Sequence, residues 1–120
     1  MEAPLIATDR LAHVPEKIRS ILVEVKQDLT AYYGDRLQKV LLFGSYARGD
    51  FHDESDVDIM PLLTFLNGSM WDEKSRLFDI IYPYFEKIYI SISVLPATLE
   101  NFTTSDKFFF RFVRKDAIEL

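Results

Sequence analysis

The feature that most constrains the fold of this chain is a pair of apolar segments separated by a short polar stretch. The first segment ends in the run VLLF at residue 43, directly before Gly44 and Ser45, and the second begins with DVDIMPLL at Asp56. Short apolar runs bounded by glycine, serine and aspartate are typical of buried strands. We therefore expect strands over about 37–43 and 56–65 that pair like a hairpin.

Gly44 and Ser45 occupy the point where the first strand must turn. Glycine has no Cβ, so the backbone can turn tightly there and its amides can face an anion. A short helical turn over 45–48 would direct free amide groups toward the same anion. We expect Ser45 to donate its amide and hydroxyl to phosphate, and Arg48 to contact a phosphate oxygen. The alternatives for Arg48 are a surface role or a pair with Asp50.

Two aspartates begin the second segment. The period-2 geometry of a strand places Asp56 and Asp58 on one face and the apolar residues beside them on the other. Two such carboxylates repel each other unless a cation lies between them. In a chain without cysteine, oxygen ligands favour Mg²⁺ or Mn²⁺, with triphosphate oxygens completing the shell. Gly-Ser alone and Asp-x-Asp alone are both common, but together at this spacing they predict a site for a metal-bound nucleotide.

The combination resembles the pattern of the DNA polymerase β-like nucleotidyltransferases, and within them the minimal (MNT) type often found beside HEPN-domain partners. That pattern is an apolar residue, Gly-Ser, about ten residues, and then alternating aspartate and apolar residues. Seven residues match it in identity and spacing, namely Phe43, Gly44, Ser45, Asp56, Val57, Asp58 and Ile59.

The resemblance implies an α+β nucleotidyltransferase fold with a small mixed twisted sheet and helices mainly on one face. It implies Mg²⁺-dependent transfer of an NMP, AMP from ATP, onto an acceptor hydroxyl such as a tyrosine of a HEPN-type toxin. Asp56 and Asp58 would be the catalytic metal ligands. Gly44, Ser45 and Arg48 would bind the phosphates. The partner would be a HEPN-domain or other acceptor protein, with this chain acting as the antitoxin.

One departure from the family pattern bears on activity. Active members usually carry a third carboxylate on the strand expected over 88–95, and this chain reads IYISISVL there. Ser91 is the residue expected in its place, with Ser93 as the other candidate. A serine neither takes a proton nor binds a metal as a carboxylate does. The alternative function is therefore a catalytically weakened, antitoxin-like module that acts by protein contact, and a nucleotide-sugar glycosyltransferase is the weaker third option.

Periodicity and capping residues predict two longer helices. Apolar residues at helical spacing indicate a helix over 15–33, with Gly34 after its end. Ser69 and Asp72 indicate a capped helix that runs to about residue 87. Pro83 should kink or shorten this helix.

The second half of the chain contains further predicted elements. Residues 88–95 indicate a third strand, residues 103–106 are candidates to cap a last helix, and 117–120 indicate a short edge strand. The aromatic run from Phe108 to Phe112 favours the core or a subunit interface over a base-stacking platform. Residues 1–13 lack a pattern and are expected to form a loosely held arm.

Length and charge limit the remaining choices. The 120 residues suffice for one domain, 1–120. The net charge of −5 argues against a long nucleic acid as the main partner, whereas a metal-bound nucleotide brings its own counter-ion. There is no leader pattern and no run of roughly 20 apolar residues that could span a membrane. We therefore expect a cytoplasmic protein, and homo-oligomerisation stays open.

Overall fold

The computed structural model describes residues 9–120 and centres on one mixed sheet. The strands lie in the order β3-β2-β1-β5, and β4 pairs with β2 beyond the end of β3. β1 is antiparallel to β2 and β5, whereas β3 and β4 run parallel to β2. The strand bounds are β1 (Leu37–Phe43), β2 (Val57–Leu63), β3 (Ile92–Val94), β4 (Ala97–Thr98) and β5 (Ile118–Glu119).

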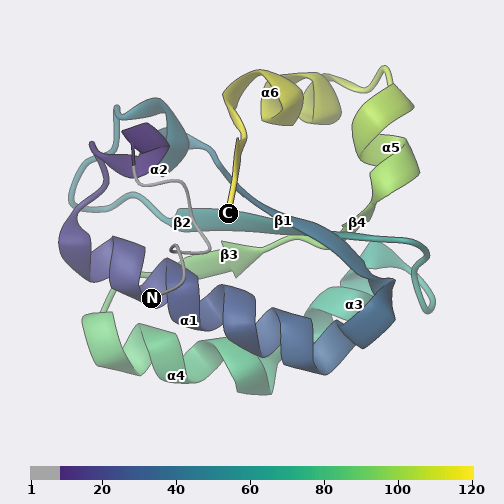
Figure 1. Cartoon of the computed structure of the whole chain (residues 1–120), viewed down its shortest axis with the longest axis horizontal. Coiled ribbons are helices and arrows are strands. Elements are labelled where there is room, and N and C mark those ends of the chain that lie inside the picture. Colours follow the sequence, from purple (N-terminus) through teal and green to yellow (C-terminus); the bar gives the residue numbers. More distant parts are fainter. Residues whose placement is uncertain (1–8) are drawn as a thin grey trace.

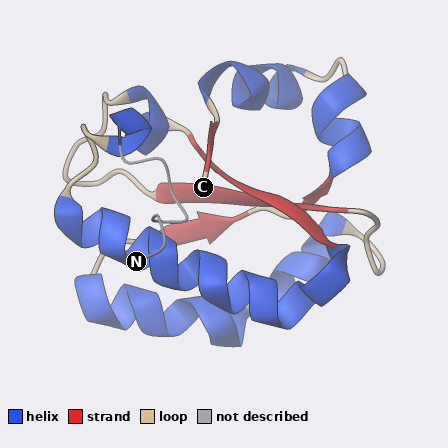
Figure 2. Ribbon diagram, viewed as in Figure 1, coloured by secondary structure: helices blue, strands red, loops and turns tan. Residues whose placement is uncertain are grey.

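Helices lie on both faces of this sheet, with α1 and α4 side by side beneath it and α5 and α6 above it in the view of Figures 1 and 2. Strand alternation produces both layers. Leu42 and Ile59 pack with α1 and α4 in one core cluster, whereas Leu41 and Met60 pack with Phe110 of α6 in a second. The helical elements are η1 (Asp9–Leu11), α1 (Glu16–Tyr33), η2 (Gly34–Arg36), α2 (Ser45–Arg48), α3 (Met70–Arg76), α4 (Phe78–Ile88), α5 (Leu99–Thr104) and α6 (Phe108–Asp116).

These layers confirm the predicted α+β class with a small mixed sheet. The two longest helices, α1 and α4, share one face, and the shorter α5 and α6 lie over the other. Within the described part of the chain, no helix combines the length and the apolar character needed to cross a membrane.

The predicted helix over 69–87 is two helices, divided at Leu77 rather than at Pro83. The predicted cap is present as a capping box, in which the Asp72 amide donates to Ser69 Oγ (3.1 Å) and the Ser69 amide donates to Asp72 Oδ2 (2.8 Å). Because a new helix starts directly after Leu77, Pro83 lies one turn inside it and removes a single backbone hydrogen bond.

The strand predicted over 88–95 is shorter than expected and covers only Ile92–Val94. The preceding helix ends at Ile88, close to the predicted end, and the residues between the two elements form its cap and a connection. Ile81 and Ile88 are both buried and lie two helical turns apart, so burial of one helix face holds the chain in helix this far. Tyr89 then ends the helix with a φ of 56°, and its amide donates to the Phe85 carbonyl at 2.7 Å.

The C-terminal region also differs in detail from the prediction. Residues 103–106, the predicted cap of the last helix, instead contain the end of α5 and part of its connection to α6. The side-chain cap here is Thr98, whose Oγ1 accepts from the Asn101 amide at 3.1 Å at the start of α5. The edge strand predicted over 117–120 is present as β5.

The predicted arm covers residues 1–13, of which 1–8 lie outside the described residues. Residues 9–13 contact the domain. Leu11 is only 1% exposed, and His13 Nε2 lies 2.8 Å from the Tyr46 carbonyl oxygen.

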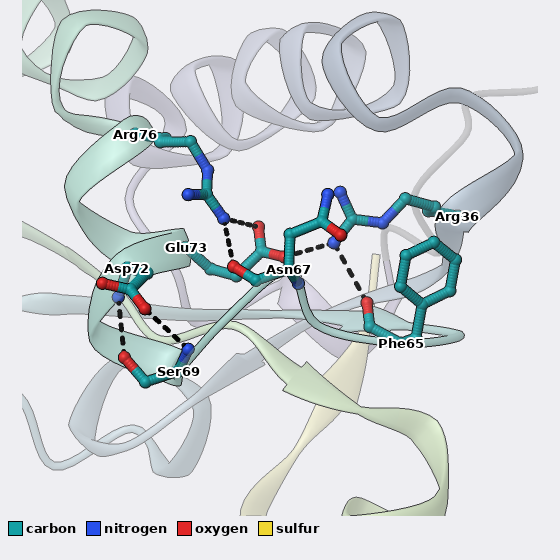
Figure 3. Close-up of polar contacts among 7 residues, drawn as sticks. All are labelled: Arg36, Phe65, Asn67, Ser69, Asp72, Glu73 and Arg76. Atoms are coloured by element: carbon teal, nitrogen blue, oxygen red, sulfur yellow. Dashed lines mark hydrogen bonds and ion pairs between the residues drawn. The ribbon is translucent and has the colours of Figure 1, made fainter.

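A buried charge cluster ties the start of α3 to one end of the β1–β2 pair (Figure 3). Glu73 is fully buried, and its carboxylate pairs with Arg36 and accepts from the Asn67 amide at 2.6 Å. Arg76 lies 3.6 Å away on the other carboxylate oxygen. Arg36 also donates to the Phe65 carbonyl at 3.0 Å. These residues lie where β1 begins and β2 ends, opposite the Gly-Ser turn.

Candidate active site

The two halves of the predicted motif meet at the other end of the β1–β2 pair. Phe43, the last residue of β1, lies opposite Asp58 of β2 in the antiparallel register. Gly44 follows with a φ of 76°, a conformation that disfavours every residue with a Cβ. A Cβ at Gly44 would overlap Asp58 Oδ2 and lie 3.2 Å from Asp58 Cγ. The glycine corner is therefore in direct contact with this carboxylate.

The predicted helical turn is present as α2, which begins at Ser45 and ends at Arg48. The amides of Ala47 and Arg48 both donate to the Gly44 carbonyl at 3.0 Å. The first two amides of α2, those of Ser45 and Tyr46, are the ones that a ligand could accept from. Core contacts fix α2 in place. Tyr46 is buried, and its ring stacks on Phe51 with centroids 4.4 Å apart. His13 contacts the Tyr46 carbonyl from the N-terminal side.

The electrostatics centre on Asp58. Burial, and after it the charge of Asp56, raises the pKa of Asp58 to about 6, and Arg48 opposes the rise. Asp56 is exposed and directly precedes β2. The described residues include no cluster of three or more histidine, cysteine or acidic side chains able to hold a metal. Two neighbouring carboxylates, one of them costly to ionise, suit a divalent ion whose other ligands come from phosphate oxygens.

Arg48 lies at the site but is bound to two carboxylates. Its Nε lies 3.2 Å from Asp50 Oδ2, the alternative pairing considered from the sequence. Its Nη1 lies 2.9 Å from Asp116 Oδ2, a partner 68 residues away at the end of α6. These hydrogen bonds, first to Asp116 and then to Asp50, raise the pKa of Arg48. A phosphate contact by Arg48 stays a prediction.

A pocket of about 330 Å³ joins these residues to α6. Its polar side is formed by Gly44, Ser45, Arg48 and Asp58, four of the five predicted site residues. Asp56 is not in the wall of this pocket. The remaining wall is aromatic, aliphatic or acidic, namely Phe43, Phe109, Phe112, Val113 and Asp116. Phe43 is part of the predicted motif, whereas the run from Phe108 to Phe112 was assigned to the core or an interface, and Asp116 was missed by sequence reasoning.

Ser93 takes the place beside Asp58 where the third carboxylate was expected. The parallel register of β2 and β3 sets Ser93 opposite Asp58, whereas Ser91, the first candidate, precedes β3 and accepts from the Val57 amide through its carbonyl at 2.9 Å. Asp79 and Glu86 belong to α4 on the other face of the sheet. Neither supplies a third acid at this position.

Residues 18–90, more than half of the chain, match the family of nucleotidyltransferase domains. The chain therefore belongs to the nucleotidyltransferase domain family, and the predicted enzyme class is confirmed. A Methanocaldococcus jannaschii protein named "putative protein adenylyltransferase" is 40% identical over 77 residues, which are 64% of this chain and 76% of that protein. A second protein of that name from the same organism is 36% identical over 76 residues, 63% of this chain and 52% of the relative.

Two solved structures share the fold. A crystal structure described as a "putative nucleotidyltransferase" from Sulfolobus solfataricus has a TM-score of 0.57 and 18% identity, with 98% of this chain and 90% of the other covered. A crystal structure of a toxin–antitoxin with AMP-PNP has a TM-score of 0.50 and 20% identity, with 80% and 69% covered.

Proposed function

We propose that this nucleotidyltransferase moves AMP from ATP onto a hydroxyl of another protein. The name shared by the sequence relatives, protein adenylyltransferase, supports AMP as the transferred group and a protein as the acceptor. The observation that carries the proposal is the contact between the Gly44 corner and Asp58, which joins a phosphate-binding turn to a carboxylate with a raised pKa.

The chain's residues would act by position and charge. The amides of α2 and the Ser45 hydroxyl bind the β- and γ-phosphates, and Arg48 turns from its carboxylate partners to a phosphate oxygen. Asp56 and Asp58 would hold Mg²⁺, which supplies charge neutralisation at the phosphates when bound. The acceptor oxygen attacks the α-phosphorus, the bond from that phosphorus to the bridging oxygen breaks, and pyrophosphate leaves. The hydroxyl proton passes to a phosphate oxygen of the substrate, because Ser93 offers no base.

We further propose that the acceptor belongs to a partner protein, of the HEPN type that the sequence resemblance implies. An apolar groove of about 750 Å³ between α3, α4 and β3 supports a protein-binding surface. Exposed rings line it, among them Trp71, Phe78 and Tyr82. Phe78 and Tyr82 stack with centroids 5.3 Å apart. The groove lies on the α4 face of β3, the edge strand next to β2. A protein bound there would reach around this edge to bring its hydroxyl to Asp58 on the other face.

A second candidate function is neutralisation of the partner by contact alone. The specific observation that favours it is Ser93 in place of a third acid. Under this alternative the chain binds the partner tightly and transfers nothing, and replacing Asp58 leaves neutralisation unchanged.

Label transfer tests the proposal. The wild-type chain is incubated with a purified HEPN-type partner, Mg²⁺ and ATP labelled at either the α- or the γ-phosphate. Adenylylation transfers the α-label only, whereas phosphorylation would transfer the γ-label only. We expect α-label on the partner, lost with Asp58→Asn and retained with Asp106→Asn, an exposed acid outside the site. Partner binding without any α-label would contradict the proposal and support the contact-only alternative.

A further inference from the structure

Helix α6 presents its aromatic residues to two different environments. Phe110 and Val113 are buried in the second core cluster beneath the helix. Phe109 and Phe112 instead line the pocket that contains the Gly-Ser turn, and they are 39% and 63% exposed. Phe108 is 73% exposed and is not part of the pocket wall. The helix therefore directs two aromatic side chains that lie outside the core cluster toward the site, and Phe112 is the more exposed of the two.

Several contacts fix α6 over the site. Asp116, with a side chain only 12% exposed, pairs with Arg48 at 2.9 Å. The Phe109 ring meets Phe43 edge to face, with centroids 5.9 Å apart and planes at 87°. The following residues pass directly into β5, which is hydrogen-bonded to β1. The aromatic wall is thus held on the same scaffold as the glycine corner.

The pocket consequently has two chemically different sides. The side formed by Gly44, Ser45, Arg48 and Asp58 has polar groups suited to phosphates and a metal. The side formed by Phe109, Phe112 and Val113 has no side-chain donor or acceptor, and a flat ring is the natural partner for an exposed ring. A nucleotide has the same division, with a charged phosphate tail at one end and a planar base at the other.

We propose that α6 is the base-binding wall of the nucleotide site, with Phe112 as the ring on which the base stacks. This inference rests on the proposed nucleotidyltransferase function and adds the residue that distinguishes a nucleotide from a bare polyphosphate. Phe109, Phe112 and Val113 have no hydrogen-bonding side chain to recognise base edges, and Asp116 of the same helix is paired with Arg48. Stacking therefore favours both purines, and ATP and GTP should bind with affinities within a few-fold of each other.

The test compares a ligand with a base and a ligand without one. Calorimetry with Mg²⁺ measures the affinity of wild type, Phe112→Ala, Phe112→Tyr and Phe108→Ala for ATP, GTP and inorganic tripolyphosphate. Loss of one stacked base corresponds to about 1–3 kcal/mol, or roughly a 5- to 150-fold weaker Kd. We expect this loss for ATP and GTP with Phe112→Ala only. Tripolyphosphate affinity should stay within about twofold, Phe112→Tyr should restore nucleotide binding, and Phe108→Ala should match wild type.

Each contrary outcome has a distinct meaning. Unchanged ATP affinity in Phe112→Ala would overturn the base-stacking role. An equal loss for ATP and tripolyphosphate would overturn it as well, because it would show a structural effect of the substitution on the phosphate side. If wild type binds none of the three ligands, or if Asp58→Asn binds them as wild type does, the proposed function itself fails and this inference fails with it.

Discussion

At the scale of single residues, Gly44 and Asp58 constrain each other. The positive φ of Gly44 and the space taken by Asp58 Oδ2 both exclude a side chain at position 44. The same close approach leaves Asp58 partly buried beside the negative charge of Asp56, which raises its pKa. The site proposed to hold anionic phosphates thus contains a carboxylate that is costly to ionise when no cation is present.

We predict that Gly44→Ala destabilises the fold and abolishes nucleotide binding. A side chain in this backbone region costs about 1–3 kcal/mol, and the overlap displaces Asp58 as well. Gly34→Ala is the matched control, because Gly34 also has a positive φ (56°) but a Cβ there meets nothing within 4 Å. Denaturant unfolding and Mg·ATP titration should show a loss of stability in both variants and a loss of binding in Gly44→Ala alone. Retained nucleotide binding in Gly44→Ala would show that Gly44 is not part of the nucleotide site.

We predict that Asp58→Asn stabilises the metal-free protein at neutral pH. The pKa of Asp58 is about 6 in the folded protein, against an ordinary value of 3.8. Between pH 3.8 and 6 the folded state therefore binds more protons at this carboxyl than the unfolded state does. The stability of the wild type therefore falls as the pH rises from about 4 to 6, and at higher pH the ionisation of Asp58 causes no further loss. The variant escapes this loss and should gain about 1–2 kcal/mol at pH 7, after allowance for solvent screening, with little gain at pH 4.

Urea unfolding at pH 4 and pH 7 without divalent ions measures the difference. Asp106→Asn removes an exposed carboxylate and should show no such pH-dependent gain. An equal gain at both pH values would indicate that the Asp58 pKa is not raised in the folded state.

At the scale of secondary-structure elements, the sequence predicts the segments whose pattern is local. The helix over 15–33, the strand over 37–43 and the box formed by Ser69 and Asp72 depend on spacing and capping within a few residues, and the structure has all three. The end of α4 at Ile88 agrees with the predicted end at about residue 87. The break at Leu77 was missed, because it follows from burial against α1 and the sheet rather than from neighbouring residues.

We predict that Glu73→Ala lowers the free energy of unfolding by about 3–5 kcal/mol. The substitution removes the carboxylate that pairs with the largely buried guanidinium of Arg36. Glu73→Gln should cost less, because the amide carbonyl can still accept from the Asn67 amide. Glu86→Ala, an exposed acid on α4, is the control and should change stability by no more than about 0.5 kcal/mol. Chemical denaturation measures all three. Similar losses for Glu73→Ala and Glu86→Ala would show that the cluster of Figure 3 contributes little.

At the scale of the whole molecule, the C-terminal segment closes the fold and the site together. β5 pairs with β1, with Ile118 opposite Leu42, and the preceding helix α6 supplies one side of the pocket. Sequence reasoning found the motif half of the site because its residues are close along the chain. Sequence reasoning did not place α6 at the site, because no local pattern indicates that Asp116 pairs with Arg48, which lies 68 residues earlier in the chain.

We predict that Ile118→Ala lowers both stability and nucleotide affinity. Ile118 is buried in the larger core cluster, so its truncation should cost about 2–4 kcal/mol, and loosening of β5 should release α6 from the pocket. Glu119→Ala removes only a half-exposed ion pair with Lys39 and should cost less than about 1 kcal/mol. Thermal unfolding and Mg·ATP titration test both variants. Loss of stability without loss of affinity would show that the pocket does not depend on this closure.

The pairing of Leu42 with Ile59 and of Phe43 with Asp58 has a consequence for how this protein tolerates change. A slip of β2 by a single position would turn Asp58 toward α1 and place Ile59 on the face that carries the pocket. The register between β1 and β2 thus determines both the position of the site residues and the packing of the core. Natural selection that acted only to preserve the hydrophobic core would therefore also preserve the placement of the site residues at these positions.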